Sequence, residues 1–111
     1  MPRALLLTIL GCGLIPLNAL AVWEYSAADQ LAMYDAVEHR CGSLDPDTFR
    51  RKFAEMVKGF TAEERAQMTQ LRESAQYRES LSASSKELAQ QIAAAGKDGA
   101  AIVCKKIIGS L

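Results

Sequence analysis

The chain has 111 residues, of which 13 are basic and 13 acidic, so its formal net charge at pH 7 is zero. Proteins that bind nucleic acid carry a strongly basic face, and this balance argues against nucleic acid as a partner. Half of the residues are hydrophobic (50%), which is sufficient for one small domain near the lower size limit for a self-sufficient core.

The first 21 residues predict a secretory signal peptide. Arg3 supplies a positive charge, an apolar run extends to Ile15, and residues 19–21 read Ala-Leu-Ala, a small-x-small cleavage site. Cleavage there leaves residues 22–111 as a single helical domain. We therefore expect an exported protein, periplasmic or secreted. The domain contains no Asn and so has no N-glycosylation site, which favours a bacterial envelope.

Two alternative interpretations of this segment attach the protein to a membrane. Residues 9–12 resemble the lipobox of bacterial lipoproteins, in which Cys12 is acylated, although the apolar run before it is short. Residues 4–22 could instead remain as an uncleaved anchor with Trp23 and Tyr25 at the lipid boundary, although proline, asparagine and glycine dilute that run. Membrane contact is expected only in these two cases.

A first helix is predicted from Ser26 to about Arg40. The hydroxyl of Ser26 and the carboxylate of Asp29 three positions later match a capping box, and Gly42 is a stop signal. At about 100° per residue, one stripe holds the apolar side chains that are expected to face the core. This stripe consists of Ala27, Leu31, Tyr34, Val37 and Cys41.

The strongest amphipathic pattern lies between residues 45 and 58. Asp45 is the predicted N-cap, Pro46 occupies the first turn, where its missing N–H costs nothing, and Lys58 and Gly59 end the helix. All three phenylalanines of the chain are on its apolar face, which is expected to supply the centre of the core. This face consists of Phe49, Phe53, Met56, Val57 and Phe60.

A long surface helix is predicted from Thr61 to about Ser82. It opens with a capping box formed by Thr61 and Glu64. Its narrow apolar edge consists of Met68, Leu71 and Ala75. Serines at positions 80–85 compete for main-chain hydrogen bonds and predict a break, after which Ser84 restarts a helix.

The segment FTAEERAQM, residues 60–68, is similar to the L-T-x-x-Q helix start of periplasmic chaperones of the Spy type. Phe60 stands in place of the Leu and Glu64 in place of the Gln, and the motif occurs once. Any capping box that follows an apolar residue has this form. No family is therefore assigned from the resemblance.

Gly96 and Gly99 predict a short turn in the last segment, because each glycine costs about 1 kcal/mol inside a helix. Leu88 and Ile92 share one face before the turn, and Asp98 is expected to cap a final helix after it. The inward side of that helix consists of Ala100, Val103, Cys104, Ile107 and Ile108. No segment has the alternation of a strand. The predicted fold is all-α, a small bundle of four to five antiparallel helices.

Cys41 and Cys104 remain as a pair once the signal peptide with Cys12 is removed, and both lie on predicted buried faces. In an exported protein we expect them to form one disulfide that ties the bundle together. The alternative, that His39 and Cys41 are metal ligands or a catalytic pair, is disfavoured, because a zinc site needs several such ligands and His39 is the only histidine. No metal and no cofactor are expected.

Arg50, Arg51 and Lys52 form a concentrated basic patch opposite the phenylalanine stripe. Such a run is usually a solvated face, and its functional interpretation is a docking surface for an acidic partner or anionic lipid. The chain carries no catalytic motif, so we expect a protein that is not an enzyme. It would act through protein-protein interaction, as an accessory subunit, an inhibitor or immunity protein, or a chaperone-like binder. The alternative is a carrier that holds a small apolar ligand in a cavity between helices.

Overall fold

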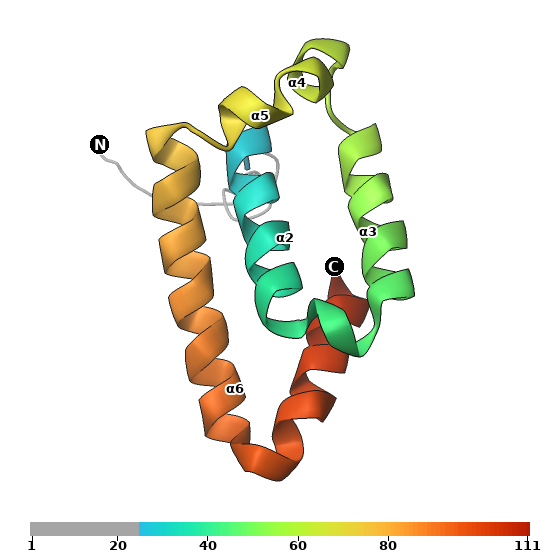
Figure 1. Ribbon diagram of the computed structural model, residues 1–111, viewed down its shortest axis with the longest axis vertical. Helices are drawn as coiled ribbons and strands as arrows, with labels where there is room; N and C mark the ends of the chain where they lie inside the picture. Colours follow the sequence, from blue (N-terminus) through green and yellow to red (C-terminus); the bar gives the residue numbers. More distant parts are fainter. Residues whose placement is uncertain (1–24) are drawn as a thin grey trace, which may run out of the picture.

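The computed structural model describes residues 25–111, so the predicted signal peptide, Cys12 and Trp23 lie outside the described residues. The described part is predominantly helical and contains no strand, which confirms the predicted all-α class. Its elements in chain order (Figure 1) are α2 Ala27–Cys41, the 3₁₀ helix η2 Gly42–Leu44, α3 Pro46–Lys58, α4 Ala62–Ala66, α5 Met68–Leu71 and α6 Ala75–Ser110.

Helix α2 lies in the middle of the fold, between α3 and the first part of α6 (Figure 1). Ser26 caps its start, since its side chain accepts a hydrogen bond from the Asp29 N–H (3.2 Å). The Asp29 carboxylate accepts hydrogen bonds from Gln76 and Ser80 of α6, so only the Ser26 half of the predicted capping box is observed. The predicted stripe is buried except for the half-buried Tyr34. A second buried stripe consists of Ala28, Ala32 and Ala36. Because these side chains are small, α6 can pack closely against this second side of α2.

Helix α3 also begins as predicted, with Asp45 accepting a hydrogen bond from the Thr48 N–H (3.3 Å). Its buried side chains, together with the one that follows its end, are Phe49, Met56 and Phe60. Phe53 and Val57 are only partly buried. Both still pack against the core, as predicted, but they lie at its edge and also line a cleft.

The segment after α3 differs from the single helix predicted from Thr61 to Ser82. The capping box of Thr61 and Glu64 is present, but α4 and α5 are short and do not continue into one another as a regular helix. A tight turn follows α5, and the hydroxyl oxygen of Ser74 then accepts a hydrogen bond from the Tyr77 N–H at the start of α6 (3.1 Å).

Contacts with α2 explain this difference. Arg72, directly after α5, donates hydrogen bonds of 2.8 and 3.0 Å to Asp35 of α2, whereas a straight helix would carry this part of the chain away from α2. The predicted break at serines 80–85 is wrong, because α6 continues through them. Ser80 donates a hydrogen bond to Asp29 of α2. Its hydroxyl therefore links α6 to α2 and does not compete for the main-chain hydrogen bonds of α6.

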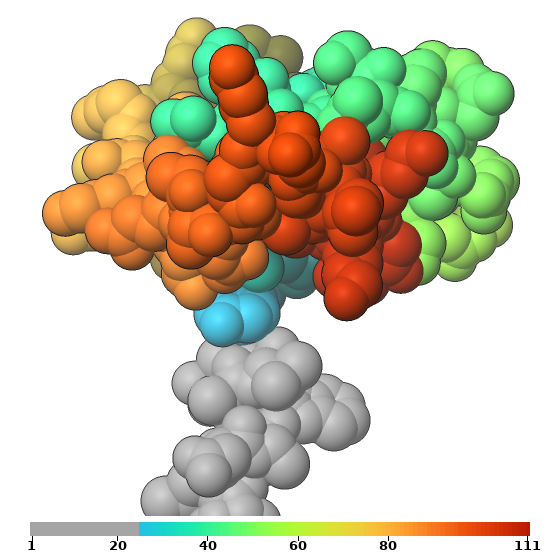
Figure 2. Space-filling view, turned by 90° about the horizontal axis from the view of Figure 1, so that it is seen from below, coloured from blue at the N-terminus to red at the C-terminus, as the bar shows by residue number. Residues whose placement is uncertain are grey.

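Helix α6 reverses direction at Gly96, where a first arm (residues 75–95) meets a second arm (residues 97–110) (Figure 1). Gly96 has φ 75° and ψ 176°, a conformation that is essentially restricted to glycine. The break predicted between Gly96 and Gly99 is therefore confirmed. Figure 2 shows both arms across the lower face of the molecule, with the second arm (red) beside α3 (green).

Replacement of Gly96 tests this reversal. Gly96→Ala is expected to lower the free energy of unfolding by about 1 to 3 kcal/mol, because a Cβ is strained in this conformation. The added Cβ would meet no other side chain of the described residues within 4 Å, so the expected loss comes from the backbone conformation. Gly109→Ala is the matched control. A Cβ at Gly109 would also meet nothing within 4 Å, but Gly109 lies in a helix and does not have a positive φ. Urea unfolding followed by circular dichroism compares the two; equal losses would contradict the assignment.

Cys41, at the end of α2, and Cys104, in the second arm of α6, form the predicted disulfide, with a Cα–Cα distance of 5.2 Å. Both are buried in a cluster that also contains Ala36, Val37, Phe49, Leu88 and Ile108. A cluster toward the other end of α2 contains Ala27, Ala28, Leu31, Ala32, Met56, Phe60 and Tyr77. The disulfide therefore lies inside the core and joins the central helix to the last part of the described chain.

Candidate functional site

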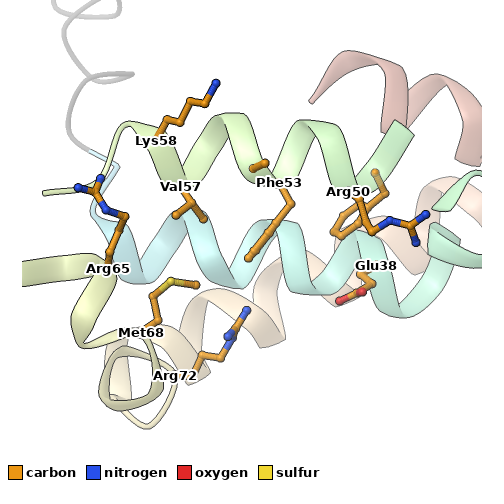
Figure 3. A pocket seen from close by; sticks show the side chains of 10 residues that line it. Glu38, Arg50, Phe53, Val57, Lys58, Arg65, Met68 and Arg72 are labelled. Atoms are coloured by element: carbon orange, nitrogen blue, oxygen red, sulfur yellow. The ribbon is translucent and has the colours of Figure 1, made fainter. Parts of the chain in front are cut away.

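A cleft of about 980 Å³ lies between α3, α2 and the segment that carries α4 and α5 (Figure 3). This volume is at the upper end of the range for ligand sites, roughly 300 to 1,000 Å³. The cleft is open to solvent and is not an enclosed cavity. Its residues come from one face of α3 and from α2, α4, α5 and the turn after α5.

The floor of the cleft is apolar. Phe49, Phe53 and Val57 recur every four residues along α3 and therefore share one face, and Met68 of α5 lies across from them (Figure 3). The rings of Phe49 and Phe53 have centroids 6.2 Å apart, and Tyr34 of α2 lies 6.3 Å from each. This aromatic cluster holds α3 against α2 and fixes the depth of the cleft.

Positive charges surround this floor. Arg50 and Lys58 come from α3, Arg65 comes from α4, and Arg72 follows α5, and Figure 3 shows them on different sides of the apolar side chains. Within the described part of the chain, Glu38 of α2 is the one carboxylate that lines the cleft. The cleft is therefore an apolar surface with a positively charged rim.

Arg72 is held in place by α2. Its Nε and Nη2 donate to the two carboxylate oxygens of Asp35, a bidentate arrangement that fixes the plane of the guanidinium. The guanidinium carbon lies 5.9 Å from the centre of the Phe53 ring, within the range of a cation–π contact. The hydrogen bond to Asp35 raises the pKa of Arg72. Arg72 is thus a fixed positive charge at the edge of the floor.

Tyr77 joins this network from α6, because its hydroxyl donates a hydrogen bond to Asp35 (2.6 Å). Burial, and after it this hydrogen bond, raises the pKa of Tyr77 to about 12. Asp35 of α2 thus accepts hydrogen bonds both from Arg72, which follows α5, and from Tyr77, which lies in the first turn of α6. The network determines where Arg72 lies, and with it one wall of the cleft.

The raised pKa of Tyr77 predicts a loss of stability in alkali. Between pH 10 and about 12 the unfolded chain loses the Tyr77 proton while the folded chain keeps it, so the stabilisation is complete below this range and is lost across it. Tyr77→Phe is expected to make the fall in unfolding free energy across this range shallower. Tyr25→Phe is the control, because Tyr25 is 52% exposed. Urea unfolding at successive pH values measures the slope; identical slopes in wild type and Tyr77→Phe would contradict the prediction.

The other rim cations are held less firmly. Arg50 and Lys58 each pair with a carboxylate one turn away on α3, Asp47 and Glu55 respectively, and both pairs are well exposed. Exposed pairs of this kind contribute only about 0 to 1 kcal/mol. Arg65 donates a hydrogen bond to a main-chain oxygen just after α3 (2.6 Å), and no carboxylate of residues 25–111 forms an ion pair with it.

The structure divides the basic patch that was predicted at residues 50–52. Arg50 lines the cleft, whereas Arg51 and Lys52 line a separate shallow hollow on α3. Lys52 donates a hydrogen bond to the main-chain oxygen of Gly109 near the end of α6 (2.9 Å), where a cation is favoured by the helix dipole. Lys52 thus has a structural contact, and Arg50 is the member of the patch that belongs to the candidate site.

The structure gives His39 and Cys41 separate environments. His39 is exposed, and the sulfur of Cys41 is part of the disulfide. Among residues 25–111, no group of three or more His, Cys, Asp or Glu side chains is placed to hold a metal ion. In the same range, no helix combines the length and the apolar character that crossing a membrane requires.

Of the cleft residues outside α3, sequence analysis did not single out Glu38, Arg65 and Arg72, and it placed Met68 only on the apolar edge of a predicted surface helix. These residues lie outside α3, which carries the phenylalanine stripe, and helical periodicity relates only residues of the same helix. One usable signal was present, since all of the long apolar side chains between residues 61 and 74 lie on a narrow edge. That edge predicts that one side of this segment packs against the rest of the protein, but it does not predict which helix it contacts.

Comparison of the chain with protein-family profiles, with curated proteins and with solved structures gave no match. The candidate site is therefore defined by its geometry and its chemistry.

Proposed function

We propose that this chain is an exported, non-catalytic protein, folded as one small antiparallel helical bundle, that acts by binding another protein. An accessory subunit, an inhibitor or immunity protein and a chaperone-like binder all work in this way. The observation that carries the proposal is the open cleft, with its apolar floor and its positively charged rim.

The composition of the cleft supports a protein as the ligand. Phe53, Val57 and Met68 are partly exposed beside four cations, and aromatic residues, Met and Arg are the side chains enriched in protein interfaces. Contiguous apolar surface with a polar rim marks interaction sites on small proteins. An open cleft also admits a chain that continues beyond it at both ends.

Export is supported by two features of the chain. The disulfide between Cys41 and Cys104 is of a kind that persists in oxidising compartments, and residues 1–21 have the layout of a signal peptide. The partner would then be a protein of the envelope or of the extracellular medium.

Photo-cross-linking in the source cells tests the proposal. Ala54 is exposed and lines the cleft, so a benzophenone amino acid at this position is expected to give a protein adduct on irradiation. Ala101, exposed on the second arm of α6, is the matched control site and is expected to give none. A lipid adduct at position 54, no adduct, or equal protein adducts at both positions would contradict the proposal.

The volume of the cleft favours a second candidate function, a carrier of a small apolar ligand. A cleft of about 980 Å³ is large enough to accept such a molecule. Native mass spectrometry of protein purified from the source separates the two functions. A bound small molecule supports the carrier, whereas the bare mass of the chain supports protein binding.

A further inference from the structure

We infer that the cleft binds an acidic amphipathic helix of the partner protein. The inference rests on the proposed function and names the chemistry of the segment that would occupy the site. It follows from the shape of the apolar floor, the distribution of charge around it and the way each cation is held.

The floor has the shape that a helix requires. Phe49 and Val57 are eight residues apart on α3, which corresponds to about 12 Å along the helix axis, and Met68 forms the opposite side. A partner helix that places apolar side chains at i, i+3 or i+4, and i+7 presents a ridge of about the same length. Two to three turns of helix would therefore cover the floor.

The charges on the rim favour carboxylates on both sides of that ridge. Arg50 and Lys58 lie along the α3 edge, and Arg65 and Arg72 lie along the edge formed after α3 (Figure 3). An anionic lipid or fatty acid carries its charge at one headgroup and would engage one end of the rim. A helix with acidic residues flanking its apolar stripe carries charges along both edges, and the rim matches this distribution.

Three of the four rim cations are available to such a partner, namely Arg50, Lys58 and Arg65. The pairs of Arg50 and Lys58 with their neighbours on α3 are exposed and weak, so a partner carboxylate can replace or join the existing one. Arg65 forms no ion pair with any residue of the described chain. Arg72, in contrast, stays bound to Asp35 and serves to hold the Phe53 ring and the wall of the cleft.

The charge distribution also gives the bound helix an orientation. Glu38 lies at the Arg50 end of the cleft (Figure 3) and would repel a carboxylate there. Lys58 and Arg65 both lie toward the other end, on opposite sides of the floor (Figure 3). The strongest acidic character of the partner helix is therefore expected beside Lys58 and Arg65, with a neutral or basic residue beside Glu38.

Binding of synthetic peptides tests the inference. The probe is a fluorescent peptide of roughly 14 residues, about four helical turns, held helical by a hydrocarbon bridge on its outer face, with Leu along one stripe and Glu on both flanks. Two matched peptides carry Lys in place of every Glu, or the same residues in scrambled order. Fluorescence anisotropy is expected to show binding of the acidic helix to the disulfide-bonded protein, at least about tenfold tighter than either control and weaker at high salt.

Charge reversal locates the binding. Arg65→Glu is expected to weaken binding of the acidic peptide roughly tenfold or more, and Glu38→Lys to leave it equal or stronger. Arg51→Glu is the matched control, because Arg51 is an exposed arginine of α3 that does not line the cleft. Circular dichroism spectra and unfolding midpoints like those of the wild type will show that each variant is folded.

Several results would overturn the inference. The first two are absence of binding and equal binding of the acidic and basic peptides. The third is an equal loss of affinity for the acidic peptide in Arg65→Glu and Arg51→Glu. The fourth is displacement of the acidic peptide by palmitate or by phosphatidylglycerol vesicles at a lower concentration than by unlabelled peptide. Cross-linking from position 54 separates this failure from that of the proposed function. A protein adduct on a segment that is neither acidic nor helical overturns the acidic helix alone, whereas a lipid adduct overturns both.

Discussion

Reduction of the disulfide between Cys41 and Cys104 is expected to lower the free energy of unfolding by about 4 kcal/mol. The bond closes a loop across 63 positions of sequence, and its loss restores chain entropy to the unfolded state. A domain of this size has a total stability of only about 5 to 15 kcal/mol. The reduced protein is therefore expected to have an unfolding midpoint far below that of the oxidised protein in urea.

The double variant Cys41→Ala/Cys104→Ala provides the control. It should resemble the reduced wild type, and added reductant should leave its midpoint where it was. Reduction without effect on the wild type would contradict the prediction. So would two free thiols, detected by alkylation and mass spectrometry, in protein that has never met a reductant.

Truncation of Phe49 is expected to give the second large effect. Phe49 is only 5% exposed and packs in the cluster around the disulfide, so Phe49→Ala should cost about 3 to 5 kcal/mol. Phe53, one turn later, is partly exposed in the cleft. Phe53→Ala should therefore cost less stability, while it removes part of the floor on which the partner would bind.

Urea unfolding of both alanine variants, together with peptide binding, distinguishes the two roles. Phe49→Ala is expected to be the less stable of the two. Phe53→Ala is expected to remain folded and to lose affinity for the acidic peptide. If Phe53→Ala were the more destabilised variant, Phe53 would belong to the core and the floor of the cleft would be misassigned.

Features that depend on residues close in sequence were predictable. The Ser26 and Asp45 caps, the capping box of Thr61 and Glu64, and the glycine break near Gly96 follow from local chemistry and are all present. The disulfide could be predicted because Cys41 and Cys104 fall on the inward stripes of their helices and form the one pair that remains after position 21.

The path of residues 61–74 could not be predicted, and the cleft depends on it. Composition favoured one long helix there, because the residues are good helix formers. The ion pair of Arg72 with Asp35 spans 37 positions, and it leads the chain back toward α2 instead. Such long-range pairs leave no periodic trace in the sequence, so the side chains of α4 and α5 could not be placed opposite Phe53.

The return of α6 toward α2 also affects how fast the protein folds. Most helical domains fold rapidly because their contacts are local along the chain. Here the core is completed by contacts across 63 positions, so a long loop must close first, at a cost in entropy. We therefore expect slower refolding than in helical domains with local contacts, and faster refolding when the sulfurs are already joined, which stopped-flow measurements on the oxidised and reduced chains would show.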